Sequence, residues 1–302
     1  MFNQVPISYE APVYRPPSEW NSLLIQVTIG CSNNKCTYCD MYRSKKYRER
    51  SLVDITRDIA TAKKHYERIG RLPEKIFLCD GDALGAPMEL LIGVLKLIQE
   101  HFPSLRRVGI YATAENILAK THDELRELNT NGLAIAYLGL ESGDDKILHM
   151  IVKGNTAEEM INASLKIKEC GFKLSTIAML GVGGKKHSEN HVKETAQIIS
   201  KTAPHFFSFL TTFSVPGTPY HKMLERGLIQ PLTSLELLQE MYGILNQATY
   251  EHNQLIFRAN HASNNRPIGG TLPRDLNNIL VTLKDWIDNT PANTYPERPQ
   301  TM

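Results

Sequence analysis

Two patterns of hydrophobic positions alternate along the chain. Short apolar runs, typical of buried parallel strands, are followed by longer segments in which apolar residues recur every three or four positions, as on one face of a helix. The predicted strands occupy residues 23–29, 75–80, 107–113, 133–140, 173–182 and 206–215. The predicted helices occupy residues 53–69, 88–101, 121–131, 156–170, 188–202 and 233–249. This alternation predicts an α/β fold built on a parallel sheet.

Six strand-helix units are fewer than the eight of a closed barrel, so we predict a partial (β/α)6 TIM-like barrel. A strand at 255–259 and a helix at 273–288 predict a short C-terminal extension over the mouth or an edge of the barrel. The tail has few large apolar residues, so we expect it to be mobile. The predicted divisions are a lead-in at 1–22, the barrel core at 23–250, the extension at 251–289 and the mobile tail at 290–302.

Composition narrows the class of protein. The formal net charge of +2 gives no electrostatic support for nucleic-acid binding. The N-terminus lacks the features of a signal peptide, and no apolar run approaches the roughly 20 residues that span a bilayer, so we expect a cytoplasmic protein without membrane contact. In that reducing compartment, clustered cysteines are expected to be metal ligands or catalysts rather than disulfide partners, and the odd total of five agrees.

Three cysteines, Cys31, Cys36 and Cys39, fall in the loop that follows the first predicted strand. The carboxyl ends of parallel strands carry the active sites of barrels, so this loop is a candidate site. A structural zinc ion takes four ligands, and the sequence offers no fourth Cys or His close by. Three thiolates suit a 4Fe-4S cluster, whose remaining iron is open to a small molecule. Zinc stays as the alternative.

The stretch "IGCSNNKCTYCDMY" resembles the cysteine loop of the radical S-adenosylmethionine (radical SAM) superfamily. The first gap holds four residues, whereas the commonest spacing in that family has three. Further motifs match in order over roughly residues 20–225. They are closest to the subgroup that includes oxygen-independent coproporphyrinogen oxidases, Elongator-type enzymes and methylthiotransferases.

The resemblance assigns roles to residues of this chain. It implies that Cys31, Cys36 and Cys39 hold the cluster and that Tyr38 lies against the adenine of S-adenosylmethionine. The motifs "CDGDALG", "LGLESGDDKILHMIVKG" and "MLGVGG" would contact the cofactor's amino group, its ribose and methionyl end, and its adenine, respectively. The cofactor-binding residues expected from these motifs are Asp80, Gly81, Asp82, Glu141, Ser142, Lys153 and Gly181.

The implied reaction is reductive cleavage of S-adenosylmethionine to methionine and a 5'-deoxyadenosyl radical, which takes hydrogen from an unidentified small-molecule substrate. Glu141 is also expected to be catalytic, and a flavodoxin or ferredoxin would supply the electron. Whether the enzyme is an oxidoreductase or a transferase is left open. Cys79 and Cys170 are too few for a second cluster, which argues against a methylthiotransferase.

Substrate contacts are sought in the segment "FRANHASNNRPIGG". Its polar side chains can donate and accept hydrogen bonds, and arginine suits a carboxylate or phosphate. The candidates are Arg258, Asn260, Ser263, Asn264 and His261, which is also a candidate general acid or base. A capped surface turn explains the same residues equally well. The basic run at 42–50 is either an anion-binding loop or a solvated one.

Two other classes of function stay open. One is a non-catalytic carrier of haem or another metallocofactor on the same scaffold, and the other is a structural zinc protein.

Overall fold

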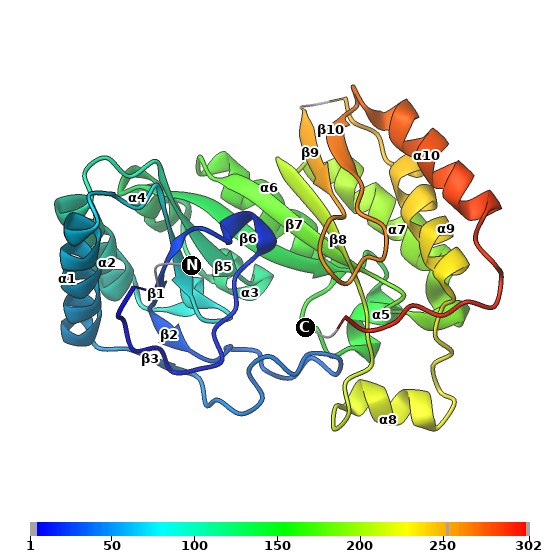
Figure 1. Ribbon diagram of the computed structural model, residues 1–302, viewed down its shortest axis with the longest axis horizontal. Coiled ribbons are helices and arrows are strands. Elements are labelled where there is room, and N and C mark those ends of the chain that lie inside the picture. Colours follow the sequence, from blue (N-terminus) through cyan, green and yellow to red (C-terminus); the bar gives the residue numbers. More distant parts are fainter. Residues whose placement is uncertain (1–4, 252–253, 300–302) are drawn as a thin grey trace. The chain divides into compact units, whose positions relative to one another are not determined.

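A computed structural model describes residues 5–251 and 254–299 (Figure 1). Residues 1–4 of the predicted lead-in, 252–253 of the extension and 300–302 of the tail lie outside the described residues. The chain divides into two compact units. The first unit comprises the described parts of 1–34, 41–138 and 166–173, and the second comprises those of 35–40, 139–165 and 174–302.

The first unit is built on parallel strands in the order β1-β4-β5-β6. These are β1 (Leu23–Gln26), β4 (Lys75–Cys79), β5 (Arg107–Ala112) and β6 (Leu133–Glu141), of which the last three residues of β6 belong to the second unit. Their apolar residues are buried almost without interruption, which confirms the strands predicted from continuous apolar runs. The first predicted strand stops at Gln26. Beyond Val27, β2 (Thr28–Ile29) pairs antiparallel with the unpredicted β3 (Arg48–Glu49).

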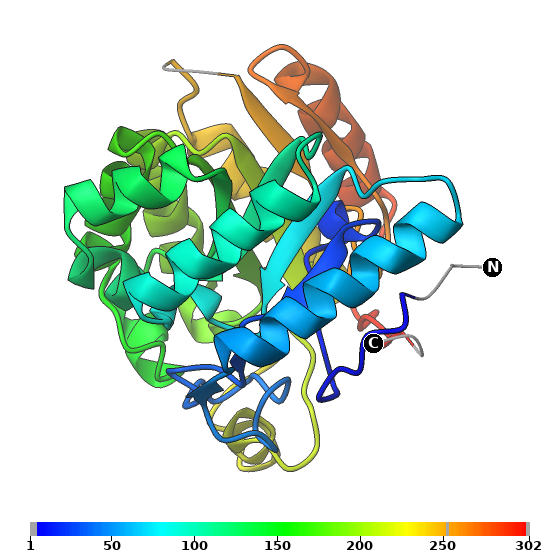
Figure 2. The same cartoon turned by 90° about the vertical axis from the view of Figure 1, so that its left-hand side faces the viewer.

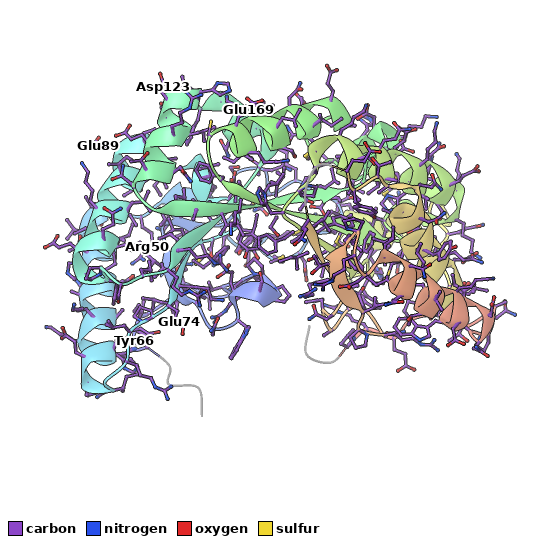
Figure 3. All side chains as sticks on the ribbon, turned by 90° about the horizontal axis from the view of Figure 1, so that it is seen from above. Arg50, Tyr66, Glu74, Glu89, Asp123 and Glu169 are labelled. Atoms are coloured by element: carbon purple, nitrogen blue, oxygen red, sulfur yellow. The ribbon has the colours of Figure 1, made fainter. Side chains whose placement is uncertain are left out.

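Helices cover the strands of the first unit. They are α1 (Leu52–Arg68), α2 (Met88–His101), α3 (Ala114–Ala119) and α4 (His122–Thr130), with short 3-10 turns at η1 (Pro17–Glu19) and η2 (Ala83–Gly85). Helices α1 and α2 lie side by side (Figure 2). Each long helix buries one apolar stripe, as Ile55 and Ile59 do in α1. Glu89 and Asp123 point outward into solvent (Figure 3).

The second unit has strands in the order β7-β8-β9-β10. These are β7 (Lys173–Leu180), β8 (Phe206–Thr211), β9 (Leu255–Arg258) and β10 (Gly269–Leu272). The first three are parallel, and β10 returns antiparallel along β9. Gly269 and Gly270, which end the segment "FRANHASNNRPIGG", belong to β10, where they lie opposite Arg258 and Phe257.

The second unit contains six helices within the described residues, of which α5 and α6 precede β7 and the last four residues of α6 belong to the first unit. They are α5 (Asp145–Met150), α6 (Ala157–Glu169), α7 (Gly184–Thr202), α8 (Pro219–Glu225), α9 (Ser234–Gln247) and α10 (Leu276–Asp288). Helix α9 packs against both α7 and α10. Phe207, Phe209 and Phe257 form the centre of the core between these helices and the strands.

The tail was predicted to be mobile. Within the described residues its start is bound to the chain before it, because the Ser234 N–H donates to the Thr294 carbonyl oxygen at 2.7 Å and the Thr290 hydroxyl donates to the Trp286 carbonyl at 2.6 Å. The mobility of the tail as a whole stays a prediction.

Each parallel strand from β4 to β8 is followed in the chain by one or two helices, which confirms the predicted α/β class. Helices α3, α5 and α8 were not predicted, because six or seven residues are too few to show a helical period. Among the described residues, no helix combines the length and the apolar character that crossing a membrane requires.

Candidate active site

The three predicted cluster ligands lie in an irregular loop directly after β2. Cys31, Cys36 and Cys39 are each partly exposed. All five cysteines of the chain lie within the described residues, and none forms a disulfide. The thiols are therefore chemically available to a metal centre.

Hydrogen bonds fix both ends of this loop. In the first unit, the Asn34 side-chain amide donates to the carbonyl oxygens of Tyr42 and Lys45 at 2.9 and 3.2 Å. In the second unit, the Thr37 N–H donates to the Ile151 carbonyl at 2.8 Å, and the Tyr220 N–H donates to the Thr37 carbonyl at 3.1 Å. The loop is thus held by the Asn34 side chain and by the backbone of Thr37.

Whether this loop suits an iron-sulfur cluster depends on the chemistry of its three thiols. Among the described residues, no three His, Cys, Asp or Glu side chains are arranged to hold a single metal ion. A 4Fe-4S cluster bonds each thiolate to a different iron, so its ligands need not converge on one point. Three thiols in one loop therefore fit a cluster better than they fit one ion.

Asp80 was expected to bind the cofactor, and the structure gives it internal partners. Its Oδ2 accepts hydrogen bonds from Gln26 Nε2 at 3.1 Å, from the Gly30 N–H at 3.0 Å and from Lys45 Nζ at 2.8 Å. The side chains of Lys45 and Asp80 are 3% and 0% exposed. This buried ion pair ties the exit of β4 to the start of the cysteine loop and to the basic run.

Gly81 lies where the chain leaves β4 and packs closely against the cysteine loop. A Cβ on Gly81 would lie 2.5 Å from a ring carbon of Tyr42 and 3.0 Å from the Cβ of Cys31. Only glycine permits this approach, and the predicted contact of Gly81 with the cofactor stays a prediction.

Asp82 is buried at the same strand exit, but no cation is paired with it in the described part of the chain. Its Oδ2 accepts hydrogen bonds from the side chains of Ser32, Thr113 and Asn116, while its Oδ1 has no partner. Burial raises the pKa of Asp82 to about 6, although these three hydrogen bonds act to lower it. The structure thus presents a buried, unpaired carboxylate oxygen, suited to a positively charged ligand.

In the second unit, Glu141 ends β6 in a left-handed backbone conformation, with φ of +61°. Its Oε1 lies 2.8 Å from Lys153 Nζ, and both side chains are largely buried. Burial, together with the Glu141 carboxylate, raises the pKa of the Tyr38 phenol well above its usual value. A residue other than glycine in this conformation is typical of functional sites.

Tyr38 also packs against an apolar cluster at the ends of the strands of the second unit. The cluster consists of Ile147, Ile151, Met179 and Val182. Packing against this cluster therefore positions the Tyr38 ring, and the contact with Glu141 positions its phenol group. Its predicted contact with an adenine stays a prediction.

Ser142 is fully buried, and its hydroxyl is used within the protein. The Asp144 N–H donates to Ser142 Oγ at 3.1 Å, and Ser142 Oγ lies 2.9 Å from His191 Nδ1 on α7. Burial lowers the pKa of His191 to about 4, so the imidazole is neutral and can accept this hydrogen bond. Ser142 thus anchors the turn after Glu141 to α7.

Gly181 follows β7 with a φ of +76°, a conformation that favours glycine. Its N–H donates to Glu240 Oε2 on α9 at 2.7 Å. The hydroxyl of Tyr220 donates to the carbonyl oxygens of Val182 and Gly181 at 3.1 and 3.3 Å. The predicted glycine segment is therefore held from two sides.

The predicted substrate residues separate into two groups. Ser263 and Asn264 are buried against β8, where their side chains bond to Thr211 and to the carbonyl of Phe209. His261 Nδ1 accepts a hydrogen bond from the Ser263 N–H at 3.1 Å, which places the ring proton on Nε2, and burial lowers its pKa.

The remaining two candidates, Arg258 and Asn260, are exposed. Arg258 donates to the carbonyl oxygens of Phe257 and Gly270.

Sequence reasoning missed four residues that position these groups. They are Lys45, Asn116, His191 and Glu240. Each lies between about 30 and 60 positions from the residue it contacts, so no local pattern connects the partners.

The α/β fold and the loop with three cysteines are the features expected of an enzyme that holds an iron-sulfur cluster. The sequence model of the Radical SAM superfamily matches residues 25–199, so the chain belongs to that superfamily. Its members bind a 4Fe-4S cluster and S-adenosylmethionine, which confirms the predicted family, enzyme class and cofactors.

Curated relatives include two tRNA-2-methylthio-N(6)-dimethylallyladenosine synthases. The protein from Zymomonas mobilis is 25% identical over 240 residues, which cover 77% of this chain and 52% of the relative. The protein from Carboxydothermus hydrogenoformans is 26% identical over 253 residues, which cover 80% and 54%. The chain thus spans about half the length of the curated relatives it matches.

Solved structures share the fold. Coproporphyrinogen III oxidase from Escherichia coli matches with a TM-score of 0.56 and 16% identity, over 75% of this chain and 52% of that one. Elp3 from the archaeon Methanocaldococcus infernus matches with a TM-score of 0.54 and 13% identity, over 91% and 64%. These matches confirm the predicted partial TIM-like barrel as the fold class.

Proposed function

We propose that the chain cleaves S-adenosylmethionine reductively and directs the resulting radical to a C–H bond of a small-molecule substrate. The observation that carries this proposal is the loop with Cys31, Cys36 and Cys39, which lies inside the segment matched by the superfamily. These three thiols would hold the cluster. A bound cluster supplies one electron to S-adenosylmethionine, which yields methionine and a 5'-deoxyadenosyl radical that takes hydrogen from the substrate.

The two aspartates of the "CDGDALG" motif have different roles in this proposal. Asp80 is neutralised by Lys45, so its charge is already balanced within the protein. In both aspartates Oδ1 is buried without a hydrogen-bond partner among the described residues, but only Asp82 has no paired cation there. We assign the amino group of S-adenosylmethionine to Asp82, because an ammonium ion would satisfy this oxygen and stabilise the ionised carboxylate.

Glu141 and Lys153 form the polar part of the proposed cofactor site in the second unit. Lys153 Nζ lies 2.8 Å from Glu141 Oε1, and we assign this pair to the ribose hydroxyls, which carboxylate oxygens can accept hydrogen bonds from. Ser142 and Gly181 act through the backbone turns that they fix. His261 and Arg258 stay candidates for substrate contact.

We infer a small-molecule substrate, although the curated relatives are named for the modification of a tRNA adenosine. Three cations of the run at 42–50 are already in ion pairs: Lys45 with Asp80, Arg48 with Glu10, and Arg50 with Asp58. This pairing reduces the charge that the run offers to phosphates. A flavodoxin or ferredoxin is the proposed electron donor.

The proposal is tested by anaerobic reconstitution with iron and sulfide, followed by reduction with dithionite in the presence of S-adenosylmethionine. We expect about four irons per chain and formation of 5'-deoxyadenosine. Alanine at Cys31, Cys36 or Cys39 should abolish both. Asp82→Asn should keep the iron and weaken S-adenosylmethionine binding by about tenfold to a hundredfold, because a charge-assisted hydrogen bond is lost.

Two outcomes would contradict the proposal. One is a full complement of iron without any 5'-deoxyadenosine, and the other is stoichiometric zinc in protein purified without air. Retention of tRNA in a gel-shift assay at physiological salt would contradict the small-molecule substrate.

A further inference from the structure

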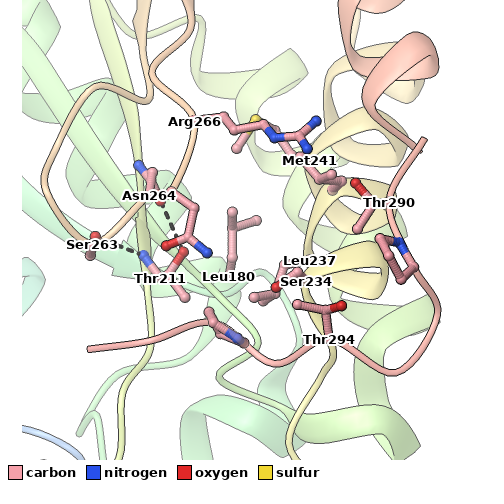
Figure 4. A pocket seen from close by; sticks show the side chains of 14 residues that line it. Leu180, Thr211, Ser234, Leu237, Met241, Ser263, Asn264, Arg266, Thr290 and Thr294 are labelled. Carbon is pink, nitrogen blue, oxygen red and sulfur yellow. Dashed lines mark hydrogen bonds between the residues drawn. The ribbon is translucent and has the colours of Figure 1, made fainter. Parts of the chain in front are cut away.

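A cavity of about 180 Å³ lies within the second unit, at the carboxyl ends of β7 and β8 (Figure 4). Leu180 is the last residue of β7 and Thr211 the last of β8, and both line it. Helix α9, the loop at 263–266 and the tail at 290–296 supply the other walls. Ligands of parallel α/β folds bind at this end of the strands. The cavity therefore lies where a substrate of the proposed reaction is expected.

One wall of the cavity is apolar. Leu180, Leu237, Leu238 and Met241 contribute aliphatic side chains from β7 and α9. This surface suits a short hydrocarbon stem, because apolar area removed from water contributes to binding. The volume restricts the stem to a fragment rather than a large ring system.

The opposite wall is held rigid by hydrogen bonds. Thr211 donates its N–H to Ser263 Oγ at 3.1 Å and its hydroxyl to Asn264 Oδ1 at 2.9 Å. Asn264 Nδ2 donates to the Phe209 carbonyl at 2.7 Å. The polar atoms of Ser263 and Asn264 are thus committed to β8. Their role is to fix the loop, so that Asn265 and Arg266 stand at the edge of the cavity.

Arg266 brings a positive charge to this edge. Its guanidinium lies 5.4 Å from the centre of the Trp286 ring, a cation–π contact that limits its motion. Within residues 5–251 and 254–299, Arg266 forms no ion pair, and no Asp or Glu lines the cavity. The local charge is therefore uncompensated.

Ser234, in the first turn of α9, provides a second donor. Its hydroxyl oxygen is buried and has no hydrogen-bond partner among the described residues, although it lines the cavity. A buried hydroxyl without a partner is costly, so a ligand that accepts its hydrogen bond gains affinity. Arg266 and Ser234 thus both favour an acceptor with negative charge.

We propose that this cavity binds the anionic group of the substrate, a carboxylate or phosphate carried on a short aliphatic stem. The stem lies against Leu180, Leu237 and Met241, and the anion accepts hydrogen bonds from Arg266 and Ser234. The tail closes the cavity, since the Thr294 carbonyl is bound to the Ser234 N–H. This inference rests on the proposed function for calling the ligand a substrate, but the binding itself does not depend on it.

The test is calorimetric titration of reconstituted protein, saturated with S-adenosylmethionine, with four six-carbon probes. These are hexanoate, hexyl phosphate, 1-hexanol and hexylamine. We expect one or both anions to bind at least about tenfold more tightly than the alcohol and the amine. The better of the two anions identifies the group as carboxylate or phosphate.

Variants localise the binding. Arg266→Gln should weaken binding of the preferred anion by about tenfold, because a charged donor is lost. Ser234→Ala should weaken it by about threefold, because a neutral donor is lost. Arg274→Gln, which removes an exposed ion pair with Asp275 outside the cavity, should leave binding unchanged. Thermal melting of each variant checks that it is folded.

Equal binding of hexylamine or 1-hexanol, or unchanged anion binding in Arg266→Gln, would overturn the inference. If anion binding fails while 5'-deoxyadenosine still forms, the proposed function stands and the subsite does not. If anions bind selectively but no cluster assembles, the subsite stands and the proposed function fails.

Discussion

The Glu141 carboxylate and the Lys153 ammonium group lie 2.8 Å apart, and Gly139 makes room for them. A Cβ on Gly139 would lie 2.3 Å from Glu141 Oε1 and 3.0 Å from Lys153 Nζ. Glycine is therefore required two residues before Glu141 so that the ion pair can form beside the strand.

Gly139→Ala is expected to displace the Glu141 carboxylate and reduce 5'-deoxyadenosine formation by about tenfold or more, since small misplacements in a site are costly. Iron content should not change. Gly93→Ala is the matched control. Gly93 lies in α2, and a Cβ at this position would meet only the flexible end of the Leu52 side chain. Normal activity in Gly139→Ala would argue against a role for the pair in cofactor binding.

Lys45→Met should lower the free energy of unfolding by about 3–5 kcal/mol, because it leaves the Asp80 carboxylate buried without its cation. Arg48→Met removes an exposed ion pair from the same basic run and should change stability by less than about 0.5 kcal/mol. Urea denaturation measures both. Similar effects of the two substitutions would show that the Asp80 pair has no special importance for the fold.

Glu240 gives stability a dependence on pH. Burial raises its pKa to about 7, with a smaller contribution from Glu236, which is itself paired with Lys185. The native state therefore binds more protons than the unfolded state between about pH 4.5 and 7, and the free energy of unfolding falls as pH rises through this window. The fall due to this group is on the order of 3 kcal/mol.

Glu240→Gln keeps an oxygen acceptor for the Gly181 N–H and removes the titration. The variant should gain stability over the wild type progressively from about pH 5 to pH 7.5 in thermal melts. His191, with a lowered pKa of about 4, contributes the opposite slope, but it does so in both proteins and cancels from the difference. A difference independent of pH would contradict the buried ionisation.

Cys79 and Cys170 are expected to hold no iron. Cys79 is fully buried at the end of β4, where burial and the Asp80 carboxylate raise its pKa, and Cys170 Sγ lies 3.6 Å from the His122 carbonyl. Cys79→Ala and Cys170→Ala should each keep the full iron content and 5'-deoxyadenosine formation. Stability should fall by about 1 kcal/mol from the lost packing. Loss of iron in either variant would contradict the assignment of Cys31, Cys36 and Cys39 as the cluster ligands.

Local patterns predicted the long elements well and the short ones poorly. The spacing of apolar residues placed α1, α2 and α9 within a few residues of their observed bounds. The pair β9 and β10 shows the limit of this reasoning. Gly269 and Gly270 have the composition of a turn, yet pairing with β9 makes them a strand, and the sequence does not encode that contact locally.

The same contrast appears in the site. "CDGDALG" identified Asp80 and Asp82 together, as two equivalent carboxylates. The structure separates them, because Lys45 reaches Asp80 from 35 positions away, while Asp82 receives only neutral donors. Which carboxylate is neutralised depends on folding, and no spacing rule reveals it.

The sequence by itself determined the class of fold and the family, through its periodicity and its three closely spaced cysteines, since periodicity and ligand spacing are properties of neighbouring residues. Only the tertiary structure decided which polar groups are satisfied and which are left over. The Asp82 Oδ1, the Ser234 hydroxyl and the Arg266 guanidinium are distinguished by what surrounds them in space. Burial and pairing are set by contacts between distant segments, and these form only when the chain folds.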